Sequence, residues 1–126
     1  MNDIKSEADI QLLIDKFYTR VVDDPVIGFI FTKVVALSWE KHIPIMNSFW
    51  SSILLGTNSY QGNPMLKHIE LNTNIPLTAD HFNRWLELWE KNIDENFKGE
   101  KSNEAKTRAK NIAAVMQHKI AVSRDK

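Results

Sequence analysis

The sequence contains no cysteine, and only four of its 126 residues are glycine. Without cysteine the chain cannot form a disulfide, a thiolate metal site or a thioether link to a cofactor. Gly28, Gly56, Gly62 and Gly99 lie far apart, so no glycine-rich loop is available to bind a phosphate or a dinucleotide. Any redox chemistry would therefore need electrons from a separate protein.

An excess of one charge sign is also missing, because 16 Lys and Arg residues balance 16 Asp and Glu residues. Nucleic acid and anionic membranes are therefore poor candidate partners. The first ten residues carry four charges, unlike a signal peptide. The longest charge-free window, residues 43–66, contains Pro44, and its apolar part ends at Gly56, short of the roughly 20 residues of a membrane span. We expect a cytoplasmic protein.

The length favours a single domain over residues 1–126, with a core from about 7 to 122. Helical periodicity dominates it. A first helix is predicted over Glu7–Val22, with Ser6 as its N-cap. Its apolar positions are Ile10, Leu13, Ile14, Phe17, Val21 and Val22. Asp24 and Pro25 then restart the chain as a short apolar turn.

A third helical segment is predicted over Ser38–Leu55, ending at Gly56. His42, Ile45, Met46, Phe49 and Ile53 share one face of it. Pro44 leaves two alternatives: the regular helix begins around His42, or it kinks at the proline.

The rest of the chain is predicted to be helical too. Residues 57–64 form a loop, and a short helix over 65–71 carries His68. Thr78 caps a long helix with Phe82, Trp85, Trp89, Ile93 and Phe97 on its apolar side, ending at Gly99. Ser102 caps a last helix that buries Ala105, Ala109, Ile112, Ala113, Met116 and Ile120. No strand pattern competes, so the fold class is all-α.

Two histidines stand out in this helical pattern. His42 opens an apolar helical stretch, and His68 follows a loop that contains Tyr60 and Pro64. An apolar slot with an imidazole on each side is what a haem iron needs, with one as the permanent axial ligand and one near the exchangeable face. Taken alone, a histidine such as His68 is more often an ordinary loop residue than a metal ligand, and each nearby ring is more often ordinary core.

The order and spacing of a longer set of residues are more specific. The set comprises Phe17, Tyr18, Phe31, Trp39, His42, Met46, Phe49, Trp50, Leu54, Leu55, Gly56, Tyr60, Gly62, Pro64, His68, Phe82 and Trp85. It resembles the truncated haemoglobins, and among them the bacterial-type group III branch, over about residues 10–120. The resemblance implies a truncated globin-like two-over-two helical sandwich that encloses haem b. Without cysteine, the haem would be bound non-covalently.

The resemblance also implies roles for single residues. His68 becomes the proximal iron ligand, and Tyr18, His42 and Trp85 lie on the ligand side. Further haem contacts are expected from Phe31, Met46, Phe49, Trp50, Tyr60, Leu71 and Trp89. A phenol and an indole donate hydrogen bonds, and a neutral imidazole donates or accepts. Such donors stabilise the negative charge that dioxygen gains on ferrous iron.

Several assignments stay open at this point. His42 could cap its helix, gate the pocket or ligate the iron as a second axial ligand. Trp50 and Trp89 fit either the core or the haem edge. Lys41, Lys67 and Arg84 are candidate partners for the haem propionates. His81 and His118 lie outside the matched set and are expected to be solvated.

The expected function is binding of dioxygen and other diatomic ligands at a haem iron. Hydrogen bonds to charged groups contribute roughly 1.5 to 3 kcal/mol each. Oxygen held that firmly leaves slowly, which favours nitric oxide or peroxide redox chemistry over transport. Nitric oxide dioxygenation and peroxidase-like turnover are the candidate activities, each with an external reductase, in a monomer. The alternatives are a cofactor-free helical interaction domain and a haem-based gas sensor with a separate output partner.

Overall fold

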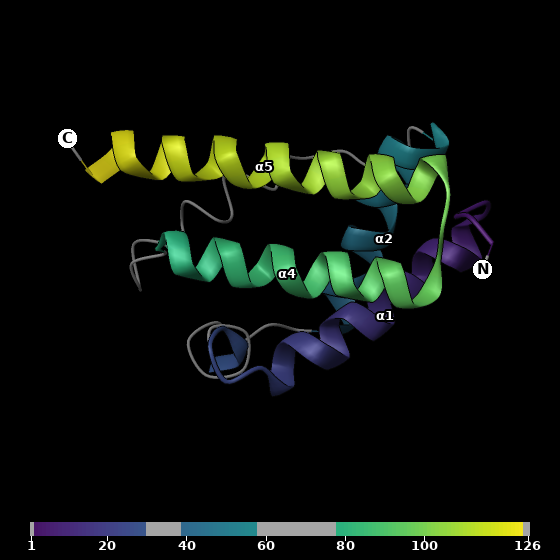
Figure 1. Ribbon diagram of the computed structural model, residues 1–126, viewed down its shortest axis with the longest axis horizontal. Coiled ribbons are helices and arrows are strands. Elements are labelled where there is room, and N and C mark those ends of the chain that lie inside the picture. Colours follow the sequence, from purple (N-terminus) through teal and green to yellow (C-terminus); the bar gives the residue numbers. More distant parts are fainter. Residues whose placement is uncertain (1, 30–38, 58–77, 125–126) are drawn as a thin grey trace.

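The computed structural model describes residues 2–29, 39–57 and 78–124, apart from the side chains of residues 39–42, 120 and 122–124. Within these ranges the chain forms four helices and no strand: α1 (Glu7–Asp23), α2 (Trp39–Leu55), α4 (Ala79–Asn96) and α5 (Glu100–Arg124). Helices α4 and α5 lie antiparallel, and α1 packs against both α2 and α4 (Figure 1). The all-α fold class is therefore confirmed, while the short helix predicted over 65–71 lies outside the described residues.

Helix α1 begins where the sequence predicts. The Ser6 hydroxyl accepts a hydrogen bond from the Asp9 N–H at 3.3 Å, and the Asp9 carboxylate accepts one from the Ser6 N–H at 3.2 Å. This capping box satisfies N–H groups that the helix itself cannot. The predicted cap at Asp24 is also confirmed, since its Oδ2 accepts from the N–H groups of Val26 and Ile27, each at 3.0 Å. The apolar stripe of α1 is buried against the core.

Helix α2 begins at Trp39, so Pro44 lies inside it. The alternative in which the regular helix begins around His42 is therefore wrong. Gly56 follows the last helical residue with a φ of +68°, a left-handed conformation that glycine adopts without strain. Trp50 and Leu54 of α2 are buried, while Met46 and Phe49 are only partly buried. The predicted end at Gly56 is confirmed.

Thr78 caps α4 as predicted, in a capping box with His81. The Thr78 hydroxyl accepts from the His81 N–H at 3.3 Å, and His81 Nδ1 accepts from the Thr78 N–H at 3.1 Å. His81 is thus a half-buried capping residue, and the expectation that it is simply solvated is wrong; His118 is exposed. Helix α4 ends at Asn96, ahead of the end predicted at Gly99.

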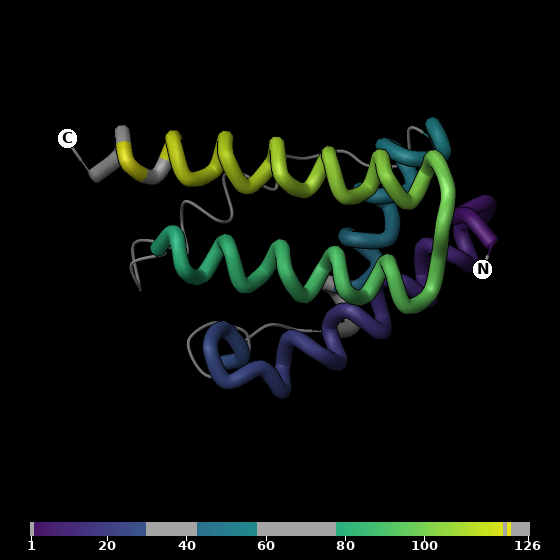
Figure 2. The backbone as a smooth tube through the Cα atoms, viewed as in Figure 1, coloured from purple at the N-terminus to yellow at the C-terminus, as the bar shows by residue number. Residues whose placement is uncertain are grey.

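The prediction that Ser102 caps the last helix is wrong, because α5 begins at Glu100 and Ser102 lies inside its first turn. The acceptor comes from the other end of the chain. Asp3 accepts from the Lys101 N–H at 2.8 Å, the Ser102 N–H at 2.9 Å and the Ser102 hydroxyl at 2.8 Å. The N-terminal segment therefore closes the corner between α4 and α5, which Figure 2 shows as a short turn of the tube.

The α4–α5 contact depends on small residues. Ala105, Ala109 and Ala113 recur at four-residue spacing on α5 and are all buried, together with Met116. Small side chains on one stripe let two helices approach closely, as ridge-and-groove packing requires. Among the helices of residues 2–29, 39–57 and 78–124, none is long and apolar enough to cross a membrane.

Candidate functional site

Tyr18, a predicted ligand-side donor, is buried on α1 with 8% of its surface exposed. Burial raises the pKa of its phenol well above the ordinary value, because the charged form is poorly solvated there. Tyr18 also lines an open groove of about 370 Å³ together with Asp15, Thr19, Val22 and Ile43, between α1 and α2.

Phe17 contacts both described ligand-side residues. Its ring centroid lies 5.2 Å from that of Tyr18 and 6.0 Å from that of Trp85, edge to face in each case. Trp85 in turn lies nearly parallel to Trp89, with centroids 6.2 Å apart. The structure thus brings a phenol of α1 and an indole of α4 against the same ring, although they are far apart in the sequence.

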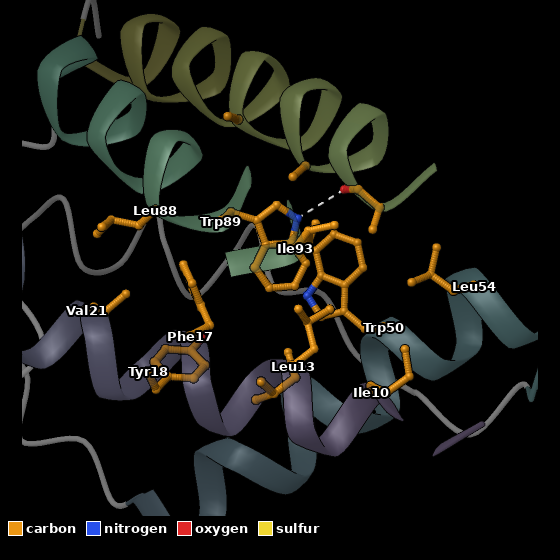
Figure 3. Close-up of a cluster of buried hydrophobic side chains, with 14 of the residues drawn as sticks. Ile10, Leu13, Phe17, Tyr18, Val21, Trp50, Leu54, Leu88, Trp89 and Ile93 are labelled. Carbon is orange, nitrogen blue, oxygen red and sulfur yellow. Dashed lines mark hydrogen bonds between the residues drawn. The ribbon is translucent and has the colours of Figure 1, made fainter. Parts of the chain in front are cut away.

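Trp50 and Trp89 lie side by side in the core, as Figure 3 shows. Together with Phe17, Tyr18 and Trp85 they form a group of contacting rings, which we call the aromatic cluster. The rings of Trp50 and Trp89 stack with centroids 4.6 Å apart, and they are 3% and 0% exposed. The Trp89 Nε1–H donates a hydrogen bond to the Ala105 carbonyl at 3.1 Å, which ties α4 to α5. Both indoles therefore serve the core, and a haem contact from either stays a prediction.

Large apolar side chains on three helices remain only partly buried. They are Ile43, Met46, Phe49, Ile53 and Leu55 of α2, Trp85 and Leu86 of α4, and Ile112 of α5. By helical register, the backbone position of His42 shares a face with Met46, Phe49 and Ile53. A flat, largely apolar cofactor such as haem would cover such a face. The residues present therefore fit haem, and the phenol of Tyr18 and the indole of Trp85 are groups of the donor type predicted for its ligand side.

Other predicted site residues lie outside the described residues: Phe31, Tyr60, His68 and Leu71, and the side chain of His42. Their roles stay predictions. Within the described part of the chain, no group of three or more His, Asp or Glu side chains could hold a metal ion.

Arg84, a candidate propionate partner, binds carboxylates of the chain itself. Its guanidinium donates to Asp24 Oδ1 from Nε at 2.8 Å and from NH2 at 2.7 Å, and to Glu87 at 3.1 Å. Burial by itself raises the pKa of Asp24, but hydrogen bonds from Arg84 and from the N–H groups of Ile27 and Val26 outweigh it and lower the pKa. Sequence reasoning missed this pair because its members are 60 positions apart.

Asn92 is a second residue that sequence reasoning missed. It is 0% exposed, and its Nδ2–H donates to the Leu13 carbonyl of α1 at 2.9 Å. A signal was present, since Asn92 follows Trp85 and Trp89 on the apolar stripe of α4. A polar side chain on a buried stripe needs a hydrogen-bond partner, and here the partner joins two helices.

Comparisons with known proteins agree with this geometry. The family model for bacterial-like globins matches residues 2–121. The group 3 truncated hemoglobin ctb of Campylobacter jejuni subsp. jejuni serotype O:2 is 30% identical over 118 residues, which cover 91% of each chain. The crystal structure of a group III truncated hemoglobin from Campylobacter jejuni superposes with a TM-score of 0.81 at 28% identity, covering 95% of each chain.

Proposed function

Because this chain belongs to the bacterial-like globin family and is a group III truncated haemoglobin, we propose that it binds haem b and carries out redox chemistry on nitric oxide or peroxide rather than transporting oxygen. Membership of the family implies haem and small gaseous ligands. The observation that carries the finer proposal is that the buried phenol of Tyr18 and the indole of Trp85 both pack against the ring of Phe17.

Haem, when bound, supplies an iron centre that takes a diatomic ligand and exchanges electrons. In this proposal His68 would bind the iron, and the partly buried apolar residues of α2 would pack against the haem. Lys41 and Lys67 remain candidates for the propionates. Arg84 is the weaker candidate, because Asp24 and Glu87 already bind its guanidinium.

In this proposal the Tyr18 hydroxyl and the Trp85 indole N–H would donate hydrogen bonds to the bound diatomic ligand. Each hydrogen bond to a charged group contributes roughly 1.5 to 3 kcal/mol. If Tyr18 and Trp85 each supply one, ligand binding tightens by roughly a hundredfold to ten-thousandfold, since about 1.4 kcal/mol is tenfold. Tightening of that kind lowers the dissociation rate. A protein that releases oxygen so slowly is suited to reacting with it rather than to delivering it.

The test compares oxygen dissociation from the ferrous protein with and without the phenol. Tyr18→Phe removes the hydroxyl and keeps the ring, so oxygen should leave roughly tenfold to a hundredfold faster. Thr107→Val is the matched control, because it removes an exposed hydroxyl of α5. An unchanged dissociation rate in Tyr18→Phe, or already fast release by the wild type, contradicts the proposal.

Steady-state turnover separates the candidate reactions. Nitric oxide consumption and peroxide turnover, each with an added reductant, should fall in Tyr18→Phe and not in Thr107→Val. If neither reaction is detected in the wild-type holoprotein, the gas-sensor alternative becomes the better account. The external reductase, the monomeric state, the cytoplasmic location and the role of His42 as cap, gate or second ligand stay predictions.

A further inference from the structure

Helices α1 and α4 run in roughly opposite directions (Figure 1). Side-chain hydrogen bonds join them on both sides of the aromatic cluster. At one end Asn92 donates to the Leu13 carbonyl. At the other end Arg84 binds Asp24. Phe17, which contacts Trp85, lies between these two ties in the sequence of α1. The register of α4 on α1 is therefore set by polar contacts on either side of the rings.

The hydrogen bonds to Asp24 restrict the position of the Arg84 guanidinium. One carboxylate oxygen accepts from Nε and NH2 of Arg84, and the other accepts from the N–H groups of Val26 and Ile27. The Asp24 side chain is 2% exposed. The corner behind it is close-packed, because a Cβ on Gly28 would lie 2.8 Å from the Val22 carbonyl oxygen. Because the fork of an arginine is planar and rigid, fixing the carboxylate fixes the guanidinium.

Arg84 immediately precedes Trp85 on the same helical turn. A helix rotates and slides as a rigid unit over one turn, so holding Arg84 holds the rotation and axial position of Trp85. Asp24, in turn, is the C-cap of α1 and lies about two turns after Phe17 and Tyr18. The ion pair therefore joins the end of the helix that carries the phenol to the turn that carries the indole.

We propose that Asp24 and Arg84 are positioning residues, which set the spacing between the Trp85 indole and the Tyr18 hydroxyl and thereby how tightly a polar diatomic ligand is held. This inference rests on the proposed function. It predicts that weakening the ion pair changes ligand release without removing either donor. A small displacement is enough, because hydrogen bonds weaken steeply as distance and angle depart from the optimum.

The same interface offers a matched control. Arg20 of α1 and Glu95 of α4 also form an ion pair between these helices, but the carboxylate side chain is 46% exposed there, against 2% for Asp24. An exposed carboxylate contributes little to stability through its ion pair. Arg20→Gln therefore repeats the chemical change of Arg84→Gln on the same helix pair, away from Trp85.

The experiment measures two quantities in Asp24→Asn, Arg84→Gln, Arg84→Lys and Arg20→Gln. The first is the indole ¹⁵N–H signal of Trp85 in the NMR spectrum, a measurement that needs no haem. The signal is identified by its loss in Trp85→Phe. The second is oxygen dissociation from the ferrous holoprotein. Asp24→Asn and Arg84→Gln should shift the indole signal and speed release by roughly threefold to tenfold. Arg84→Lys, which keeps the charge but not the fork, should restore part of both, and Arg20→Gln should change neither.

Two results overturn the inference. One is an indole signal and a dissociation rate equal to those of the wild type in folded Arg84→Gln and Asp24→Asn. The other is an equal change in Arg20→Gln, which would show a general effect of weakening the interface. Should Arg84→Gln fail to fold, Asp24→Asn and Arg84→Lys decide in its place. If the wild type retains no haem, the proposed function fails, while the indole signal still decides whether the pair positions Trp85.

Discussion

Replacing Asp3 should lower the free energy of unfolding, because its carboxylate joins the N-terminal segment to the start of α5. It accepts three hydrogen bonds from the first turn of α5, one from the Lys101 N–H and two from Ser102. The adjoining Ile4 is buried at 1% exposure, and the Lys98 N–H donates to the Asn2 carbonyl at 3.1 Å. Asp3→Ala keeps the neighbouring contacts and removes the carboxylate alone.

The magnitude follows from helix capping. Replacing a capping side chain by alanine costs about 0.5 to 2 kcal/mol. A carboxylate at a helix N-terminus adds about 0.3 to 1 kcal/mol through the helix dipole. The free energy of unfolding should therefore fall by about 1 to 3 kcal/mol, and Tm by roughly 4 to 12 °C at about 4 °C per kcal/mol. Asp3→Asn keeps one acceptor oxygen, so its free energy of unfolding should lie between those of the wild type and Asp3→Ala.

The assay is urea and thermal unfolding followed by circular dichroism at several pH values. Burial by itself raises the pKa of Asp3, but hydrogen bonds from Lys101, Ser102 and Ile4 outweigh it, and the pKa is lowered. A carboxyl with a lowered folded-state pKa stabilises the fold above the unfolded value of about 3.9, and the contribution disappears as pH falls through the folded value. The difference between wild type and Asp3→Ala should be full near neutral pH and shrink below about pH 4.

Asp94→Ala is the control, because Asp94 is an exposed carboxylate of α4 whose partner Lys106 lies on α5. Exposed pairs contribute about 0 to 1 kcal/mol. The reasoning is refuted if Asp3→Ala destabilises the protein no more than Asp94→Ala does, or if its effect is the same at pH values on both sides of the carboxyl titration.

Three further predictions follow from the same structure. Gly99→Ala should cost about 1 to 3 kcal/mol in urea unfolding, because its φ is +148° and its Cβ would lie 2.5 Å from the Asp3 Cγ; combined with Asp3→Ala it should cost less than the sum, since both displace one carboxylate. Trp89→Phe should cost about 2 to 4 kcal/mol, through the lost hydrogen bond to Ala105 and lost ring volume, and should weaken the near-ultraviolet dichroism of the stacked indoles. His68→Ala should abolish the Soret band of protein expressed with haem and leave the far-ultraviolet dichroism helical; a retained band would contradict its assignment as the iron ligand.

The helices could be predicted closely because their signals are local. Ser6 with Asp9, Asp24 with Pro25, and Thr78 at the start of α4 each act within a few residues, and a period of 3.6 identifies the buried stripe. The error at Ser102 has the same origin. A serine at a helix start looks like a cap, and nothing nearby in the sequence reveals that Asp3 takes that role.

What the sequence by itself determined was the all-α class, the family and the types of residue at the candidate haem site, since periodicity, capping and the order of Tyr18, His42, His68 and Trp85 are all written along the chain. Only the tertiary structure decided which groups meet. Asp3 with Ser102, Leu13 with Asn92, and Asp24 with Arg84 are 99, 79 and 60 positions apart. Such pairs depend on how rigid helices cross in space, and no local pattern records that.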